Sequence, residues 1–486
     1  MNTKRKRIIT IIAAVLLIMN CSTVRAIPPK PSEGGMGGPG GPNSTDVTYK
    51  AATTISSNTE EARKIYSSSA GSENALLVTG GNSTISSGTV TKTGDSNGDN
   101  ADFYGTNAAI LVKDGKLNIS GGNITTNGSH ANAVFAYSSG IINISNATIK
   151  TTSNNSGAIM VTGGGTLTAN DVTATTEGDS SAPIRSDRGG GTLTVNGGTY
   201  TANGIGSPVI YSTADITVNN AVLTSTASEG AIVEGKNSIT LNNTVLTDTN
   251  TALHGNSETY KNIFIYQSMS GDAEVGNASF TANNSKITTN KGDTIFVTNT
   301  KTNIELIGNS IVNNDDEGAF LRIQSSKWGN KGSNGGDVTL NAEKQNIEGD
   351  IYVDEISKLT MSLTERSNYL GTINSSNSSK SIVVNLDSNS TLTLTGDSYI
   401  TSLENEVEDN SNINLNGYTL YVGDAQITST EYSSEKIAED PNVVKGIMYE
   451  ATKKDITISF VITIALIILA IIVFIKNRRD RKKEFE

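Results

Sequence analysis

The stretch KLNISGGNITTNG, Lys116 to Gly128, carries the pattern from which the fold follows. Two apolar residues, Leu117 and Ile119, stand two positions apart, and a Gly-Gly break follows them. A third apolar residue, Ile124, comes five positions after the second. Apolar residues that alternate with polar ones over a few positions, bounded by turn residues, are typical of short β-strands. The stretch therefore predicts two short strands separated by a bend.

The same pattern returns along the chain at steps of 25, 25, 26, 23 and 23 residues, measured at its second apolar position: Ile119, Ile144, Ala169, Val195, Val218 and Leu241. A coil of this length cannot bury its own apolar face, so it must stack on its neighbours, and a period in this range indicates a solenoid. Far down the chain the same offsets return at Leu392, Leu394 and Tyr399.

Each unit also has a second apolar run ahead of this pattern, as in AILV (109–112), AVFA (133–136) and AIMV (158–161). Helices are not expected, because the runs are strand-length and Gly, Asn and Ser separate them. Gly and Asn suit the bends, since both adopt left-handed backbone cheaply. We predict an all-β fold with a single right-handed parallel β-helix of fourteen to sixteen coils over residues 47–427. One ladder would face inward, and a file of threonines would face outward: Thr91, Thr125, Thr175, Thr201, Thr224, Thr247 and Thr288.

Both ends of the chain carry targeting patterns. Residues 1–26 read as a signal peptide, with basic residues, an apolar run and a V-R-A triplet, and 27–46 as a Gly/Pro-rich linker. At the other end, 428–455 is a polar stalk, 456–475 is apolar enough for one transmembrane α-helix, and 476–486 is a basic tail. These segments predict a single-pass cell-membrane protein with an extracellular repeat region and a cytoplasmic C-terminus.

Composition limits the chemistry of the region between signal and tail. The only cysteine, Cys21, falls in the predicted signal peptide, so the mature chain would form neither disulfides nor thiolate metal sites. Of 37 Lys and Arg and 48 Asp and Glu in the whole chain, 26 and 45 lie between residues 27 and 475, a net charge of −19. Such a surface repels nucleic acid and favours cations or basic partners. We expect no nucleic-acid partner.

Several segments of the chain resemble adhesin-like surface proteins of Gram-positive bacteria in the pectin-lyase-like β-helix class. They are NAAILV, GGTLTVNGGTYT, SKWGNKGSNGGDVTLNA, LTLTGDSYITSL and INLNGYTLYV, together with the early Gly-rich tract. The resemblance covers nearly all of residues 47–427. The class includes adhesins, and the signal peptide, the membrane anchor, the uninterrupted ladder and the lack of a convincing catalytic set together favour a non-catalytic role in adhesion or in binding glycans or surface proteins. The class also hosts polysaccharide lyases and hydrolases, so an enzyme remains the alternative.

The best catalytic candidate is the stretch NNDDEGAFLRIQ, which holds Asp315, Asp316 and Arg322. Paired carboxylates serve glycoside hydrolysis, and the stretch loosely resembles the polygalacturonase pattern of an Asp pair and an Arg-Ile-Lys triplet. It departs from that pattern because Gln324 replaces the Lys, the Arg follows the pair by only six residues, and no Gly-His-Gly lies between them. We favour the alternative, an acidic turn between two coils.

The insertion GDSNGDNADFYG offers oxygen ligands at alternating positions: Asp95, Asn97, Asp99 and Asp102. Ligands at such spacing can wrap Ca²⁺, the one cofactor that the sequence suggests. However, Asn100 stands where an EF-hand loop needs Gly, and no Glu closes the loop. A plain polar loop is the alternative.

A second long insertion, SSKWGNKGSNGGD, contains Trp328, the only tryptophan. An exposed aromatic residue on a rigid scaffold can stack on a sugar face, and Trp328 is therefore a candidate ligand-binding residue. The alternative is that it covers the edge of a neighbouring coil. The two histidines, His130 and His254, lie at expected turns and have no partner at metal-ligand spacing.

Overall fold

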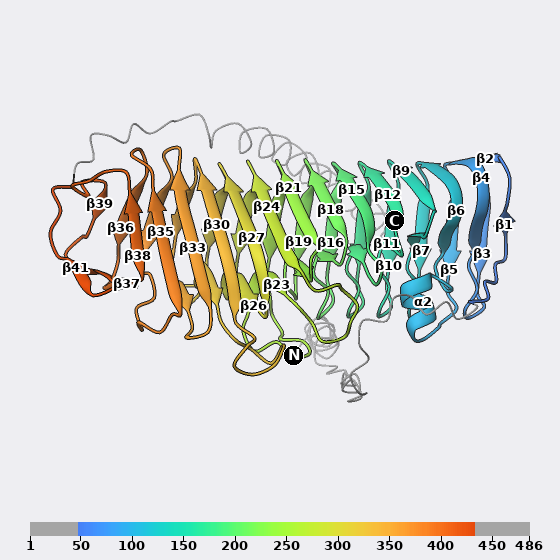
Figure 1. The fold of residues 1–486 in the computed structure, drawn as a ribbon. Helices are drawn as coiled ribbons and strands as arrows, with labels where there is room; N and C mark the ends of the chain where they lie inside the picture. The colour runs from blue at the N-terminus through green and yellow to red at the C-terminus, as the bar shows by residue number, and fades with distance from the viewer. Residues whose placement is uncertain (1–46, 433–486) are drawn as a thin grey trace, which may run out of the picture. The chain divides into compact units, whose positions relative to one another are not determined.

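Residues 47–432, which the computed structural model describes, form a right-handed parallel β-solenoid of about 15 turns (Figure 1). They belong to one compact unit, and their strands run from β1 (Thr54–Ile55) to β41 (Ala425–Ile427). The strands form sheets of 24, 10, 4 and 3 strands. The pairing is parallel until the last hairpin, where β40 (Leu420–Val422) and β41 run antiparallel. The predicted parallel β-helix is confirmed.

The first face of the coil holds the inward ladder. Its strands are β2 (Glu60–Ala62), β4 (Leu76–Ser86), β6 (Ile110–Ser120), β9 (Ile141–Ser145), β12 (Gly165–Asn170), β15 (Gly191–Asn196), β18 (Asp215–Asn219), β21 (Ser238–Asn242), β24 (Asn277–Asn283), β27 (Thr300–Ile307), β30 (Gly336–Glu343), β33 (Lys358–Thr364), β35 (Ser381–Leu386) and β38 (Ser402–Asn405). The six predicted ladder positions pair rung by rung, and each is at most 5 % exposed. They form one continuous apolar column, as predicted.

The second face is the 10-stranded sheet that carries the threonine file. Its strands are β3 (Ile65–Ser68), β5 (Thr89–Lys92), β7 (Asn123–Thr126), β10 (Thr148–Thr151), β13 (Thr173–Thr176), β16 (Thr199–Ala202), β19 (Val222–Ser225), β22 (Val245–Asp248), β25 (Lys286–Thr289) and β28 (Ser310–Asn313). Its inward residues, such as Ile124 and Ile149, are buried. The seven predicted threonines lie in one register with Lys150 among them, and all are exposed or half-exposed.

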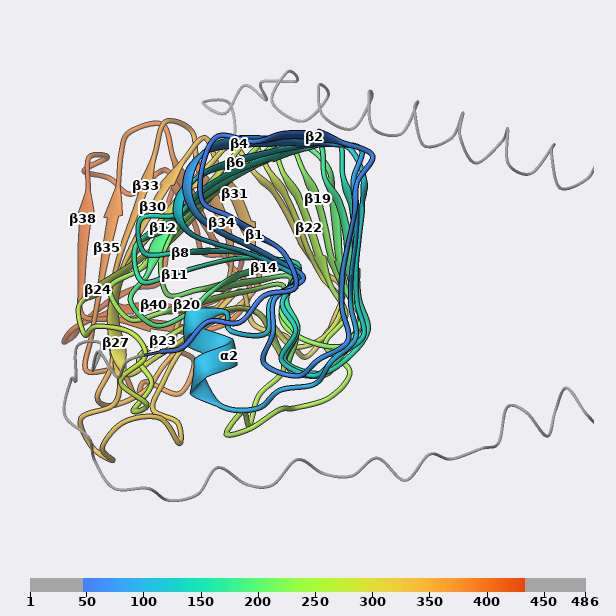
Figure 2. The same ribbon diagram turned by 90° about the vertical axis from the view of Figure 1, so that its right-hand side faces the viewer.

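The third face differs because several of its strands are buried on both sides. It comprises β1, β8 (Val134–Tyr137), β11 (Ile159–Thr162), β14 (Ile184–Ser186), β17 (Ile210–Ser212), β20 (Ala231–Glu234), β23 (Lys261–Tyr266), β26 (Asp293–Thr298), β29 (Leu321–Ile323) and β32 (Ile351–Val353). All six residues of β23 and of β26 are buried. In Figure 2 the loops beside β23 and β26 lie on the same side of the coil as helix α2 (Asp99–Tyr104). These insertions cover the outer surface of the third face.

Near the C-terminal end the coils continue through two smaller sheets. One contains β31 (Asn346–Glu348), β34 (Asn368–Gly371), β36 (Thr391–Leu394) and β39 (Ile413–Asn414), and the other contains β37 (Ser398–Ile400), β40 and β41. Leu392 in β36 pairs with Tyr369, and Tyr369 pairs with Ile347. The pattern at Leu392 and Leu394 therefore lies in this smaller sheet and does not extend the first-face ladder. Val384 and Leu386 of β35 hold the ladder positions.

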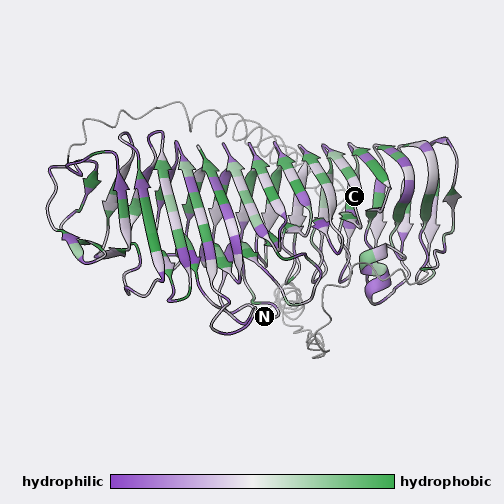
Figure 3. Cartoon of the chain, in the orientation of Figure 1, coloured by the Kyte–Doolittle hydropathy of each residue, from purple (hydrophilic) through white to green (hydrophobic). Residues whose placement is uncertain are grey.

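Asparagine side chains connect successive coils at the end of the first face. The series is Asn170, Asn196, Asn219, Asn242 and Asn283. Each asparagine after the first donates its side-chain N–H to the Oδ1 of the asparagine one coil earlier, over 2.8 to 2.9 Å. The bend that follows uses left-handed backbone, as at Asn220, with φ 56°, and Asn243, with φ 49°. Figure 3 shows apolar and polar residues alternating along the strands beside these bends. The predicted role of Asn in the bends is confirmed.

Helix α2 is a helix within the repeat region, where the sequence pattern predicted strands and turns. It occupies the insertion GDSNGDNADFYG and ends at Gly105, whose φ of 70° gives the left-handed C-cap. The buried Ala101 fixes it on the solenoid. Six residues of an insertion can therefore form one turn and a half of helix where the coil itself admits only strands.

The structure does not support the prediction of a C-terminal transmembrane helix at 456–475. A spanning helix needs about 20 apolar residues. In the range 47–432 the helix is α2, which is six residues long, and no helix there has the length and apolar character to cross a membrane. The segment 456–475 itself, like the predicted signal peptide, linker and basic tail, lies outside the described residues. The single-pass membrane localisation depended on that helix and is not supported.

Candidate functional site

Aromatic side chains gather on the outer surface of the third face, where β20, β23 and β26 lie side by side. Ile232, Phe264 and Phe296 stack in register on successive coils. Together with Tyr266 and Trp328 they form an outer apolar cluster that is separate from the solenoid core. The stretches KNIFIY and DTIFVT carry the sequence signal for this cluster, because each contains a continuous apolar run, IFIY or IFV, where an exposed strand would alternate.

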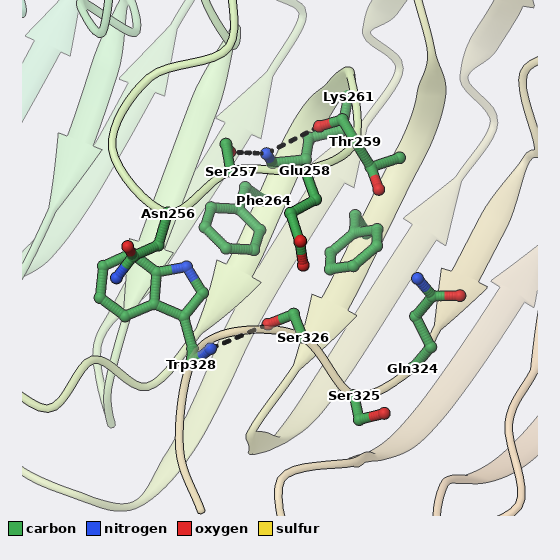
Figure 4. A pocket seen from close by; sticks show the side chains of 11 residues that line it. Asn256, Ser257, Glu258, Thr259, Lys261, Phe264, Gln324, Ser325, Ser326 and Trp328 are labelled. Carbon is green, nitrogen blue, oxygen red and sulfur yellow. Dashed lines mark hydrogen bonds between the residues drawn. The ribbon is translucent and has the colours of Figure 1, made fainter. Parts of the chain in front are cut away.

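A pocket opens beside this cluster, between the loop that precedes β23 and the loop that follows β29 (Figure 4). It holds about 290 Å³ of empty space, open solvent included, and its lining is Asn256, Ser257, Glu258, Thr259, Lys261, Phe264, Phe296, Gln324, Ser325, Ser326 and Trp328. The exposed pair Lys327 and Glu258 joins the two loops, with Nζ 3.0 Å from Oε1. The two insertions therefore build the pocket, and the coil beneath supplies its floor.

The rings around the pocket contact one another in a fixed arrangement. Phe264 stacks on Tyr266 with ring centroids 4.4 Å apart and planes 11° apart, and it lies 5.8 Å from Phe296 at 55°. Trp328 packs against Tyr266 at 4.8 Å and 57°. The backbone N–H of Trp328 donates to Ser326 Oγ at 3.2 Å, which holds the start of the loop. The indole Nε1 is buried and has no hydrogen-bond partner among the described residues.

Lys261 places a buried charge at the edge of the pocket. Its side chain is 2 % exposed, and Nζ lies 3.1 Å from Oε1 of Glu229, which is also buried. Nζ also donates to Thr259 O at 3.0 Å and to Ser257 Oγ, and it lies 4.5 Å from the centroid of the Phe264 ring. Burial opposes ionisation of Glu229, but the Lys261 charge and hydrogen bonds outweigh it and lower the pKa of Glu229. The two groups form a neutralised ion pair.

A second polar network lies behind the aromatic cluster, on the side of β17 and β20. Tyr266 Oη donates to Glu234 Oε2 at 2.9 Å, and Tyr211 Oη donates to the same oxygen. Burial raises the pKa of Glu234, because the charged form loses its hydration. Farther along the face, Arg188 donates through Nε and Nη2 to Asp272 Oδ1, at 3.0 and 2.7 Å. This network fixes the loop after β23 over the sheet.

Arg188 also contacts helix α2, because its guanidinium lies 4.1 Å from the centroid of the Phe103 ring. One arginine therefore links the loop after β23 to α2 across the third face. Hydrogen bonds to a charged group and a cation–π contact are both stronger when water is partly excluded. The covering insertions form a connected layer over this face.

The predicted catalytic residues occupy separate positions. Asp315 Oδ2 accepts the backbone N–H of Gly292 at 2.7 Å, and this bond, aided by Lys291, lowers the pKa of Asp315. Asp316 is exposed in the same turn. Arg322 lies on the outer surface of β29, where it binds Asp293 through Nε at 2.6 Å and Nη2 at 3.1 Å. No hydrogen bond or ion pair within residues 47–432 joins Arg322 to either aspartate.

The predicted calcium ligands are divided among several contacts. Asp95 Oδ1 accepts the backbone N–H of Ser129 at 2.7 Å, and Asp102 lies 2.8 Å from His130 Nδ1. Asp99 is exposed at the start of α2, and Asn97, two residues before it, is exposed as well. The described part of the chain contains no group of three or more His, Cys, Asp or Glu side chains placed to hold a metal ion. Calcium binding stays a prediction.

Comparison of the chain with protein-family models, with curated proteins and with solved structures finds no match. The resemblance to pectin-lyase-like surface proteins is therefore supported only as far as the parallel β-solenoid itself. Trp328 is the predicted ligand-binding residue that lines the pocket, together with Gln324, which stands in place of the lysine of the polygalacturonase pattern.

Proposed function

We propose that the protein is a glycan-binding β-solenoid and that the pocket beside Trp328 is its sugar site. The observation that carries the proposal is the lining, which places aromatic rings next to amide, hydroxyl and carboxylate groups within one concave site. Sugar rings present C–H faces that pack on aromatic rings, and their hydroxyls need donors and acceptors in fixed places. This lining offers both at once.

Free hydrogen-bonding groups support the proposal. The side-chain amides of Asn256 and Gln324 form no hydrogen bond with other described residues, although both line the pocket. Figure 4 shows them on opposite sides of it, with the Glu258 carboxylate between. An amide offers two donors and an acceptor, which suits the paired hydroxyls of a sugar. A ligand can use these groups without breaking an existing bond.

Binding is favoured over the enzymatic alternative by the contacts of the candidate catalytic residues. Asp315 caps a turn and Arg322 is bound to Asp293. An acid or base must reach the proton it transfers, either directly or through one water. Neither residue lines the pocket.

Intrinsic fluorescence gives a direct test, because Trp328 is the only tryptophan of the chain. The purified full-length protein is first screened on an array of host glycans, bacterial wall polymers and protein ligands. Glycans that bind are then titrated while the emission of Trp328 is recorded, and we expect the emission to shift with occupancy. Binding is also measured calorimetrically for Trp328→Ala, which should lose at least about 10-fold in affinity. Tyr418→Ala, at an exposed site in another coil, is the matched control and should bind normally.

Two results would contradict the proposal. If no glycan on the array binds, the function is wrong. If glycans bind but Trp328→Ala and Tyr418→Ala retain the same affinity as the unmodified protein, the pocket is not the sugar site.

A further inference from the structure

We infer that the pocket beside Trp328 selects an uncharged sugar that carries an N-acetyl group. The inference rests on the proposed function and specifies the ligand of the same site. Three features of the pocket carry it: its charges are already paired, a buried indole N–H lacks an acceptor among the described residues, and two phenylalanine rings form an apolar wall.

The charges of the pocket argue against acidic sugars. Lys261 is paired with Glu229, and Lys327 is paired with Glu258. Among the described residues, Lys261 is the cation that lines the pocket, and Lys327 lies beside it on the loop that carries Trp328; each is paired with a carboxylate. A uronate or a sulfated sugar would therefore meet no unpaired cation there, and its own negative charge would lie near the Glu258 carboxylate, which points into the pocket in Figure 4. Like charges at close range in a partly buried site repel. An uncharged sugar avoids this penalty.

The unpartnered donor points to a carbonyl group on the ligand. Trp328 Nε1 is buried without a hydrogen-bond partner in the described part of the chain, and Figure 4 shows it on the edge of the indole that faces the pocket. An indole N–H is a donor only, so its partner must supply an acceptor. The carbonyl oxygen of an acetamido group is a stronger acceptor than a sugar hydroxyl, because the amide is polarised. Trp328 itself is half-exposed, and a ligand reaches Nε1 when the indole turns from its present position, a step that is part of the inference.

The apolar wall suits the methyl of the same group. Phe264 and Phe296 both line the pocket, and neither ring carries a polar atom. A hydroxyl pressed against these rings would lose its hydration without gaining a partner. A methyl group there buries apolar surface instead, which is favourable. The donor on one side and the rings on the other therefore match the two ends of an acetamido group.

The test compares oligosaccharides that differ in this group alone. The full-length protein is titrated with chitotetraose, with cellotetraose, which has the same β-1,4 linkage but hydroxyls in place of the acetamido groups, and with tetragalacturonate. Calorimetry and Trp328 fluorescence both report binding. We expect chitotetraose to bind at least about 10-fold more tightly than cellotetraose, and tetragalacturonate to bind most weakly.

Two variants test the geometry. Trp328→Phe keeps a ring and removes the N–H, so it should lower the preference for chitotetraose over cellotetraose at least about 5-fold, as loss of a specific hydrogen-bond donor does. Gln324→Ala removes a group assigned to ring hydroxyls, and it should weaken both ligands by the same factor. Circular dichroism spectra of both variants establish that they are folded.

The outcomes separate the inference from the proposed function. Equal affinities for chitotetraose and cellotetraose, or tightest binding of tetragalacturonate, would overturn the inference while leaving glycan binding in place. An unchanged preference in Trp328→Phe would also overturn it. If none of the three binds and the glycan array is also blank, both the inference and the function are wrong.

Discussion

Replacing Asp248 with asparagine is expected to stabilise the protein, and to do so mainly at neutral and alkaline pH. Asp248 ends β22 with its side chain inside the solenoid and no measurable exposure, between Ser225 and Thr289 of the adjacent coils. Its Oδ2 has no hydrogen-bond partner among the described residues. Burial, with a contribution from the charge of Glu229, raises the pKa of Asp248 from 3.8 to about 8.

The sign of the pH dependence follows from the protons that each state binds. Between pH 3.8 and about 8 the folded protein keeps a proton on Asp248 that the unfolded chain has already lost. The unfolded state then binds fewer protons, so stability falls as pH rises through this window. A shift of about 4 units at about 1.36 kcal/mol each gives a loss of about 5 kcal/mol at most, complete above pH 8. The Asp248→Asn side chain carries no charge at any of these pH values, so the variant avoids this loss.

The assay is urea unfolding followed by circular dichroism at pH 5, 7 and 9. At pH 5 the free energies of unfolding of the unmodified protein and of Asp248→Asn should differ by about 2 kcal/mol, whereas at pH 9 the variant should be about 5 kcal/mol more stable. Asp316→Asn, at an exposed turn, is the matched control and should follow the unmodified protein at all three values. The reasoning would be refuted if the free energies of unfolding of Asp248→Asn and the unmodified protein differed by the same amount at pH 5 and pH 9.

Three further predictions concern the coil and its covering layer. Val195→Asp places an unpaired carboxylate in the inward ladder and should cost several kcal/mol, whereas Thr201→Asp on the outer surface should be nearly neutral; similar melting temperatures would show that the faces are misassigned. Asn219→Ala breaks two ladder bonds of 2.8 Å and should cost about 1–3 kcal/mol, against less than about 0.5 kcal/mol for Thr217→Ala on the same strand, by urea unfolding. Arg188→Gln weakens the tie to the loop after β23, so limited proteolysis should cut that loop faster, with the rest of the coil unaffected.

Much of the coil was predictable because its rules are local. Ile119, Ile144 and Val195 recur at a coil-length period, and a one-residue slip of a strand would move every apolar side chain to the outside. The offsets at Leu392 and Leu394 repeat the pattern without repeating its place, because two apolar residues two positions apart occur on more than one face of the coil. Only the pairing of Leu392 with Tyr369 shows which face it occupies.

The site was less predictable, although part of its signal was present. Trp328 stood out as the only tryptophan, and the continuous apolar runs at β23 and β26 indicate strands covered on both sides. The partners of Trp328 come from other segments: Tyr266 lies 62 positions earlier in the chain, and Lys327 reaches Glu258 across two insertions. No local pattern relates residues that meet only because two loops fold over the same coils.

The amino-acid pattern was enough to predict the solenoid, its inward ladder, its outward threonine file and the left-handed asparagine bends. Each of these features depends either on neighbouring residues in the chain or on a repeat in which equivalent residues of successive coils stack on one another. Burial of the apolar residues favours that stacking. The folded chain was needed to show that the insertions gather over the third face, that α2 is helical, and that Asp315 and Arg322 serve different contacts. These outcomes depend on loop closure across many coils, where the energies come from individual ion pairs and ring contacts such as Lys261 with Glu229, and no periodicity in the sequence encodes such contacts.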